Sequence, residues 1–203
     1  MPNWLYEENA RQLGYSIVAG VDEAGRGPLA GPVVAAAVVL PDGFPTTALD
    51  DSKKLTAKKR NILFQQIQKS ARWGIGIAEP AEIESLNILG ATFLAMRQAI
   101  FSLEKIDYVL VDGKIPIRNL ALPQKAIVGG DGTSFSIAAA SIMAKVTRDR
   151  IMDELAKQYP FYGWDHNRGY ATAEHLAALA KFGPSPAHRF SFEPVASMAR
   201  RYA

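Results

Sequence analysis

The chain of 203 residues has no cysteine and only three histidines. The lack of cysteine excludes disulfide bridges and thiolate metal sites. His166, His175 and His188 are scattered without the spacing of metal ligands, so we assign no metal to them. Carboxylates are left as the candidate metal ligands, and they suit hard cations such as Mg²⁺ or Mn²⁺ better than zinc.

Long apolar runs and a strong charge of one sign are also missing. No apolar run approaches the ~18 residues that a transmembrane helix needs, and the first residues lack the basic and apolar regions of a signal peptide. We therefore expect a cytoplasmic protein that is not bound to a membrane. The net charge is only +3, which is weak evidence for a polyanionic partner.

The remaining pattern is that of one α/β domain over residues 1–203. Short apolar segments predict buried strands at 16–22, 32–40, 73–78, 107–112 and 124–128. The turn between the first two is too short for a crossover helix and predicts an antiparallel hairpin. Helices are expected over 4–13, from Thr56, from Pro80 and again from Asn87 to about 103, over 134–158, and from Thr172.

The first strand ends on two adjacent acids, Asp22 and Glu23, followed by the Gly25-Arg26-Gly27 turn. Neighbouring side chains of a regular strand point to opposite faces, so the two acids share a site only if the strand end is distorted. Buried acids are costly unless a cation or base compensates them. The residues alone leave two interpretations open: a metal or catalytic site, or a solvated turn with a salt bridge to Arg26.

Two further acids stand in comparable positions. Asp112 closes another apolar strand and is followed by a glycine, as expected for a site at the carboxyl ends of strands. Asp131 precedes the helix 134–158, where the helix dipole favours a carboxylate by typically ~0.3–1 kcal/mol. That structural explanation is sufficient for Asp131, and a turn or cap role stays open for Asp112.

Several polar and aromatic segments could contact a nucleic acid. Ser52 and Lys53 lie at a helix entrance that could bind a phosphate, although a basic run is usually a solvated helix face. Asp149 is interpreted as an ion-pair partner of a neighbouring base. The aromatic segment 161–170 suits stacking on a sugar or base, or else an aromatic cluster that closes the core.

These motifs, taken in order, resemble the bacterial ribonuclease HII family, a type 2 ribonuclease H, over residues 17–194. The matching stretches are Gly20–Pro28, Asp51–Leu55, Leu86–Leu89, Val111–Gly113, Gly130–Asp131, Ser136–Ile142, Ala144–Asp149, Gly169–Tyr170 and His188–Arg189. Two departures are Gly129, where a lysine is frequent, and Trp164, where a phenylalanine is common. No N-terminal substrate-binding extension of the ribonuclease HIII type is seen.

The resemblance implies a ribonuclease H-like fold, with a mixed five-stranded sheet flanked by helices and a C-terminal helical appendage over about 160–203 that contributes to substrate binding. It implies that Asp22, Glu23, Asp112 and Asp131 are catalytic and bind two Mg²⁺ or Mn²⁺ ions. The expected activity is hydrolysis of the RNA strand of RNA–DNA hybrids, and cleavage 5′ of single ribonucleotides in duplex DNA, leaving 5′-phosphate and 3′-hydroxyl ends. Its expected roles are ribonucleotide removal from DNA and RNA primer removal.

The substrate contacts implied by the resemblance begin with the 2′-hydroxyl, the group that separates RNA from DNA. Gly25, Arg26 and Gly27 would read it with backbone groups, together with Tyr170. Ser52 and Lys53 are expected to contact phosphates, as are Ser141 and Lys145. We expect a monomer; a sliding-clamp contact is kept open, although no obvious clamp peptide is present. The alternatives are a nuclease of the same fold that acts on DNA, and a non-catalytic nucleic-acid-binding relative.

Overall fold

A computed structural model describes residues 1–49, 52 and 55–202 of the chain. Its centre is a mixed five-stranded sheet with the strand order β3-β2-β1-β4-β5. β1 pairs antiparallel with β2, β2 pairs antiparallel with β3, and β4 and β5 run parallel to β1. The five predicted strands and the ribonuclease H-like α/β fold are thus confirmed. The strands are β1 (Val18–Ala24), β2 (Val33–Val39), β3 (Arg72–Ala78), β4 (Tyr108–Asp112) and β5 (Gln124–Ile127).

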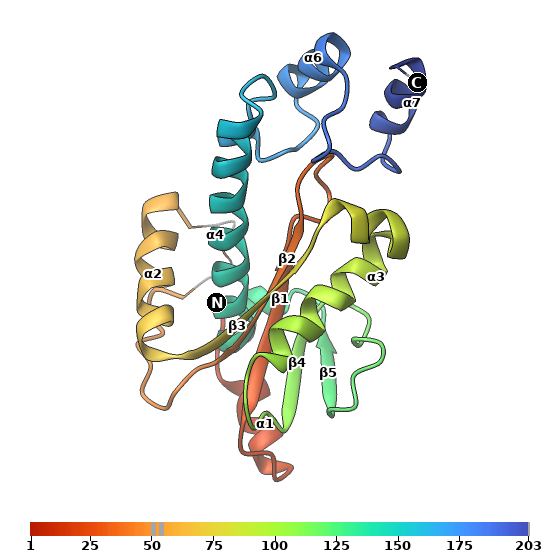
Figure 1. The fold of residues 1–203 in the computed structure, drawn as a ribbon. Helices are drawn as coiled ribbons and strands as arrows, with labels where there is room; N and C mark the ends of the chain where they lie inside the picture. Colours follow the sequence, from red (N-terminus) through yellow and green to blue (C-terminus); the bar gives the residue numbers. More distant parts are fainter. Residues whose placement is uncertain (50–51, 53–54, 203) are drawn as a thin grey trace.

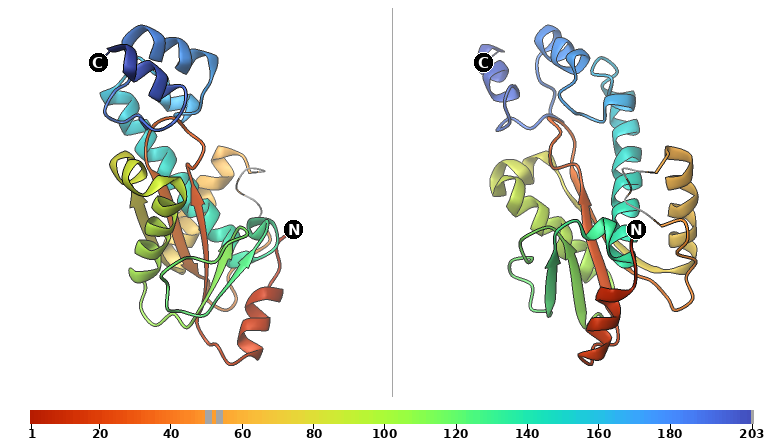
Figure 2. Two further views of the ribbon diagram at one scale, coloured as in Figure 1. Left: turned by 90° about the vertical axis from the view of Figure 1, so that its right-hand side faces the viewer. Right: turned by 180° about the vertical axis from the view of Figure 1, so that it is seen from behind.

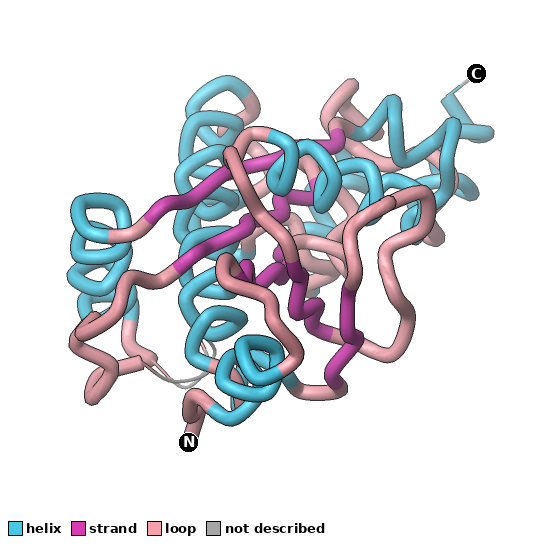
Figure 3. Tube along the Cα trace, turned by 90° about the horizontal axis from the view of Figure 1, so that it is seen from below, coloured by secondary structure: helices cyan, strands magenta, loops and turns pink. Residues whose placement is uncertain are grey.

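Helices cover both faces of this sheet. α2 and α4 lie on one face and α3 lies on the other, as the front and rear views show (Figures 1 and 2). The view from below shows the sheet between these helices and α1 at its lower end (Figure 3). The helices are α1 (Leu5–Gln12), α2 (Ala57–Ser70), α3 (Pro80–Phe101), α4 (Phe135–Gln158), α5 (Trp164–Asn167), α6 (Ala173–Phe182) and α7 (Val195–Tyr202), with a 3₁₀ turn, η1, at Gly130–Gly132.

The predicted helix starts are confirmed by their caps. The hydroxyl of Thr56 accepts from Lys59 N, and the hydroxyl of Thr172 accepts from His175 N. Asn87 has φ 58° inside α3, and its Oδ1 accepts from the backbone N–H groups of Leu89 and Gly90. Asn87 therefore caps a second helical segment across a kink, which matches the two adjoining helices that the sequence predicts.

The core is divided by the alternation of side chains along the strands. Val33, Ala35 and Ala37 of β2 pack with α3, whereas Ala36 and Val38 pack with α2 and α4. The sheet and α4 approach closely at Gly20, where an added Cβ atom would lie 2.1 Å from the carbonyl carbon of Ser136. A glycine is required there because any side chain would push α4 away from β1.

The C-terminal helices form a separate cluster at the end of the sheet where the loop after β1 lies. Leu29 and Ala30 of that loop pack with Met152 of α4 and with the appendage residues Trp164 and Leu179. Figures 1 and 2 show α6 and α7 beyond this loop, at the far end of α4. Within the described residues, no helix is both long and apolar enough to cross a lipid bilayer.

Candidate active site

Asp22 and Glu23 lie within β1, in regular pairing with β2. Asp22 is opposite Ala36 and Glu23 is opposite Ala35, and the register continues to Ala24 without a bulge. Partners in an antiparallel pair share a face, so Asp22 faces α4 and Glu23 faces α3. The strand thus continues one residue past the two acids on which the sequence has it end, and it lacks the distortion that could have turned both acids one way. The two carboxylates are nevertheless close enough for the charge of Glu23 to raise the pKa of Asp22.

Asp112 lies at the end of β4, next to β1 in the sheet. Its Oδ1 accepts a hydrogen bond of 2.7 Å from the backbone N–H of Gly130. Asp131, the next residue, lies in η1 and is buried, with 6% of its surface exposed. The parallel β1–β4 pair thus delivers Asp22, Glu23 and Asp112 to one edge of the sheet, and Gly130 links Asp112 to the turn that carries Asp131.

The acids influence one another electrostatically. Burial raises the pKa of Asp22 well above its ordinary value, and the charges of Glu23 and Asp112 raise it further. Burial also raises the pKa of Glu23, an effect that the nearby Arg26 guanidinium opposes and that Asp112 reinforces. A bound cation would relieve both the burial and the repulsion, so this set of oxygen donors fits a hard divalent ion.

These acids do not form a closed metal cage. Across residues 1–49, 52 and 55–202, no group of three Asp, Glu, His or Cys side chains is arranged to hold one ion. Mg²⁺ in phosphoryl-transfer sites is commonly held by one or two carboxylates together with water and substrate phosphate. The arrangement fits such an open site, in which the nucleic acid completes the ligand set.

The loop after β1 is held by two fully buried arginines. Arg189 donates to the carbonyls of Gly25 (2.6 Å), Arg26 (2.9 Å) and Gly31 (2.8 and 3.0 Å). Arg148 of α4 donates to the carbonyls of Pro32, Ala30 and Arg168 at 3.0 to 3.1 Å. Burial lowers the pKa of Arg148 to about 10 and that of Arg189 to about 9.

The two arginines explain the glycine at position 25. Gly25 has φ +93°, and an added Cβ would lie 1.9 Å from Nε of Arg148. A residue with a side chain would be strained at this φ and would also displace the guanidinium. Sequence reasoning placed Arg148 and Arg189 in matching motifs but missed this structural role, because the carbonyls that they bind in the loop after β1 are 116 to 164 residues away in the chain.

Tyr170 stands beside the Gly25–Gly27 loop, as its expected role requires. An added Cβ on Gly27 would lie 3.6 Å from Cε1 of the Tyr170 ring. The ring is 47% exposed, so one part of it contacts the loop and the rest faces solvent. Arg26, also close by, forms an ion pair with Glu23 at 3.2 Å, which was the plainer of the two interpretations of this turn.

Two of the four residues expected to contact phosphates, Ser52 and Ser141, lie near Asp22 on the α4 side of the sheet. The hydroxyls of Ser52 and Ser141 are 2.8 Å apart and buried, and Ser141 also hydrogen-bonds to Asp22. Ser141 therefore supports the carboxylate from the α4 side, and Ser52 contacts Ser141. Lys53 lies outside the described residues.

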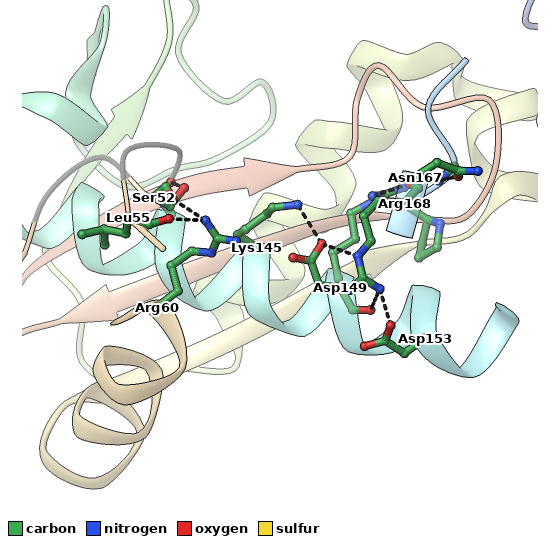
Figure 4. A network of polar contacts seen from close by, with 12 residues as sticks. Ser52, Leu55, Arg60, Lys145, Asp149, Asp153, Asn167 and Arg168 are labelled. Carbon is green, nitrogen blue, oxygen red and sulfur yellow. Dashed lines mark hydrogen bonds and ion pairs between the residues drawn. The ribbon is translucent and has the colours of Figure 1, made fainter. Parts of the chain in front are cut away.

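Lys145 is engaged in an ion pair. Its Nζ donates to Asp149 Oδ1 at 2.7 Å, and Arg168 joins the same network by donating to the Asp149 carbonyl and to Asp153 (Figure 4). The prediction that Asp149 pairs with a neighbouring base is confirmed. A phosphate contact from Lys145 would have to compete with this pair.

A cleft adjoins the acids on the α3 face. It has a volume of about 320 Å³ and is bordered by Glu23 and Asp112 on one side and by apolar side chains of α3, including Leu89 and Phe93, on the other. Arg26 and Lys114 also border it. The acids are therefore accessible from a concave surface that carries both signs of charge.

Known proteins resemble this chain in sequence and in fold. The family model of ribonuclease HII matches residues 19–195. A ribonuclease HII from Desulfitobacterium hafniense is 56% identical over 193 residues, which are 94% of this chain and 74% of that protein. The ribonuclease H2 structure from Pyrococcus horikoshii has a TM-score of 0.77 at 27% identity and covers 92% of this chain and 99% of that one. The Archaeoglobus fulgidus ribonuclease HII, solved as a complex with PCNA, has a TM-score of 0.76 at 26% identity and covers 88% and 96%.

Proposed function

Because the chain belongs to the ribonuclease HII family and is an endoribonuclease of that type, we propose that it cleaves the RNA strand of RNA–DNA hybrids. It also cuts duplex DNA on the 5′ side of single embedded ribonucleotides and leaves 5′-phosphate and 3′-hydroxyl ends. The observation that carries this proposal is the position of Tyr170 against Gly27. Gly27 follows Glu23 by four residues, and Asp112 is close enough to Asp22 and Glu23 to raise the pKa of both acids. A site for hydrolysis thus adjoins a surface that can read a ribose.

Asp22, Glu23, Asp112 and Asp131 would hold divalent metal. Their oxygen donors fit Mg²⁺ or Mn²⁺, and the raised pKa values of Asp22 and Glu23 reflect a burial and repulsion that a cation would offset. When bound, two such ions supply the activation of a water molecule and the neutralisation of charge on the leaving 3′-oxygen. The hydroxyl of Ser141 orients Asp22 for this role, and the hydroxyl of Ser52 contacts that of Ser141.

The loop Gly25–Gly27 reads the 2′-hydroxyl. Arg189 already donates to the carbonyls of Gly25 and Arg26, so the loop offers mainly its N–H groups to the ribose. The absence of a side chain at position 27 lets the sugar approach the backbone closely, whereas Gly25 makes room for the Arg148 guanidinium. The Tyr170 ring closes the other side of this subsite and stacks on the adjacent sugar, which favours a deoxynucleotide there.

The alternative functions make different use of the same residues. A nuclease that acts on DNA would keep the acids but has no need for a glycine loop packed against Tyr170. A non-catalytic relative would have no need to keep four acids, each of which lies at or next to the same sheet edge in this chain. The geometry therefore favours the ribonucleotide-specific enzyme. A sliding-clamp contact and a monomeric state stay predictions for this chain.

The proposal is tested with two short labelled duplexes, one entirely DNA and the other with one ribonucleotide in one strand. Each is incubated with Mg²⁺, Mn²⁺ or EDTA, and Asp22→Asn serves as the inactive control. One metal-dependent cut 5′ of the ribonucleotide, with the DNA duplex intact, is the expected result. Cleavage of both duplexes would contradict the 2′-hydroxyl reading, and cleavage of neither would contradict the catalytic assignment.

A further inference from the structure

Two buried histidines connect the C-terminal loop to the backbone of Tyr170. His175 lies in the first turn of α6, His188 lies in the loop after α6, and both are fully buried. Their Nε2 atoms are 3.1 Å apart. Nδ1 of His175 is 2.8 Å from the carbonyl oxygen of Tyr170. A continuous path of side-chain contacts therefore runs from His188 to Tyr170.

The neighbouring donors determine which nitrogen carries each proton. Ser185 N donates to Nδ1 of His188 at 2.9 Å, so the proton of the neutral His188 ring is on Nε2. Trp164 Nε1 donates to Nε2 of His175 at 3.1 Å, so the proton of His175 is on Nδ1. His188 Nε2–H then shares the single lone pair of His175 Nε2 with the Trp164 N–H, and His175 Nδ1–H donates to the Tyr170 carbonyl. We call this chain of hydrogen bonds the histidine relay.

The surroundings keep both rings neutral and in place. Tyr162 and Trp164 enclose them, with ring centroids 4.8 and 5.1 Å from that of His188. Burial lowers the pKa of His175, and burial together with His175 lowers the pKa of His188 to about 3. Both shifts favour neutral rings, in which the hydrogen bonds of the relay can form.

The residue after His188 holds the opposite side of the same subsite. Arg189 donates to the carbonyls of Gly25 and Arg26, and its own N–H donates to the Leu29 carbonyl at 2.8 Å. Adjacent residues thus secure the loop through Arg189 and the Tyr170 backbone through the relay. Backbone hydrogen bonds also hold this region, since Leu29 N donates to the Gly169 carbonyl and Thr172 N to the Tyr170 carbonyl, both at 2.8 Å. The relay adds a side-chain contact to these bonds.

We propose that His175 and His188 are positioning residues for ribonucleotide selectivity, because the relay fixes Tyr170 at its distance from the Gly25–Gly27 loop. This inference rests on the proposed function, in which Tyr170 and the loop read the ribose. A single ribonucleotide in DNA depends most on this reading, since it offers one 2′-hydroxyl, whereas a hybrid offers one at every position of the RNA strand. A displaced Tyr170 should therefore reduce cleavage at a single embedded ribonucleotide more than it reduces cleavage of a hybrid.

The test uses two substitutions of His175 that differ in which contact they keep. His175→Asn places an amide donor near Nδ1 and keeps the bond to the Tyr170 carbonyl, whereas His175→Gln places its amide near Nε2 and loses that bond. Because small misplacements at a site are costly to rates, we expect His175→Gln to lower kcat/KM at a single embedded ribonucleotide by about tenfold more than on a hybrid. His175→Asn should restore most of that selectivity. His166→Gln, at an exposed histidine of α5, is the matched control and should change neither rate.

Double substitution separates positioning from general stabilisation. If the relay acts through Tyr170, His175→Gln should cost no further selectivity in a Tyr170→Ala background. Equal losses on both substrates, or full additivity with Tyr170→Ala, would overturn the inference. A Tyr170→Ala enzyme with wild-type selectivity would instead refute the proposed ribose reading, and the relay's role with it. If His175→Gln does not fold, as judged by circular dichroism, His188→Asn breaks the relay one step earlier and is read by the same criteria.

Discussion

Arg26, in the turn that follows β1, forms an ion pair with Glu23 of that strand across 3.2 Å. The Arg26 guanidinium is half exposed and opposes the rise in the pKa of Glu23 that burial causes. The side chain of Arg26 thus lowers the pKa of Glu23, while its backbone belongs to the loop proposed to read the ribose.

Removal of the Arg26 charge should shift the pH dependence of cleavage. In Arg26→Ala the pKa of Glu23 rises further, so a higher pH is needed to ionise it. We expect the acid limb of the kcat/KM profile to move upward by less than about one pH unit, since the pair is partly screened by solvent. Arg26→Lys keeps the charge and should leave the limb near its wild-type position. An unchanged limb in Arg26→Ala would show that Glu23 does not determine it.

Substitution of Asp22 should separate activity from stability. Burial, Glu23 and Asp112 raise the pKa of Asp22 above 3.8 in the folded protein. Above that pH the folded state binds more protons than the unfolded chain, so the free energy of unfolding falls as pH rises towards the folded-state pKa. Asp22→Asn removes this loss and keeps an acceptor for the N–H of Glu23.

In EDTA we therefore expect Asp22→Asn to melt at a higher temperature than the wild type at pH 8, by about 2–4 °C for each kcal/mol recovered. The difference should disappear near pH 4, where the wild-type carboxyl is protonated. The variant should still bind substrate but not cleave it. A lower melting temperature than the wild type at pH 8 would contradict the account of Asp22 as a costly buried charge.

Tyr170→Phe should preserve folding and weaken cleavage at a single embedded ribonucleotide. The substitution keeps the ring beside Gly27 but removes the hydroxyl proposed to contact the 2′-hydroxyl. A lost hydrogen bond is worth roughly 0.5–1.5 kcal/mol, so we expect a decrease of about 2- to 15-fold in kcat/KM. The measurement compares this substrate with a hybrid under single-turnover conditions. Unchanged cleavage of the embedded ribonucleotide would remove the Tyr170 hydroxyl from the mechanism.

The fold could be predicted because its signals are local. Apolar strands, the caps at Thr56 and Thr172, and the break at Asn87 each depend on a few adjacent residues, and the structure has all of them. The position of Asp112 at the end of β4 follows from a similarly local pattern, an apolar strand that ends in an acid followed by a glycine. Even so, the sequence has β1 end on Asp22 and Glu23 and leaves a distortion there open because of the glycines that follow, whereas the pairing with β2 is regular through Ala24.

The buried side chains that hold the candidate site in place could not be predicted from such local patterns. Arg148 and Arg189 are charged residues that are usually exposed, yet both are buried here because distant backbone carbonyls satisfy them. His175 and His188 are 13 residues apart and lack ligand spacing, but the fold places their rings in contact. Such pairings depend on tertiary packing and leave no periodicity or spacing in the sequence.

Arg189→Lys should show how much the loop depends on the guanidinium. A lysine keeps the positive charge, but its single ammonium cannot reproduce the planar fork that Arg189 presents to the carbonyls of Gly25, Arg26 and Gly31. Carbonyls left unsatisfied in the interior each cost about 1–3 kcal/mol, so we expect the free energy of unfolding to fall by a few kcal/mol.

Cleavage of both substrates by Arg189→Lys should fall together with the stability, because the whole Gly25–Gly31 loop is displaced. Arg11→Lys is the matched control: Arg11 forms an exposed ion pair with Asp42, and exposed pairs contribute about 0–1 kcal/mol. Chemical denaturation gives the stability, and kinetics well below the melting temperature give the activity of the folded fraction. Wild-type stability and activity in Arg189→Lys would mean that the backbone holds the loop unaided, and the buried guanidinium would then need another explanation.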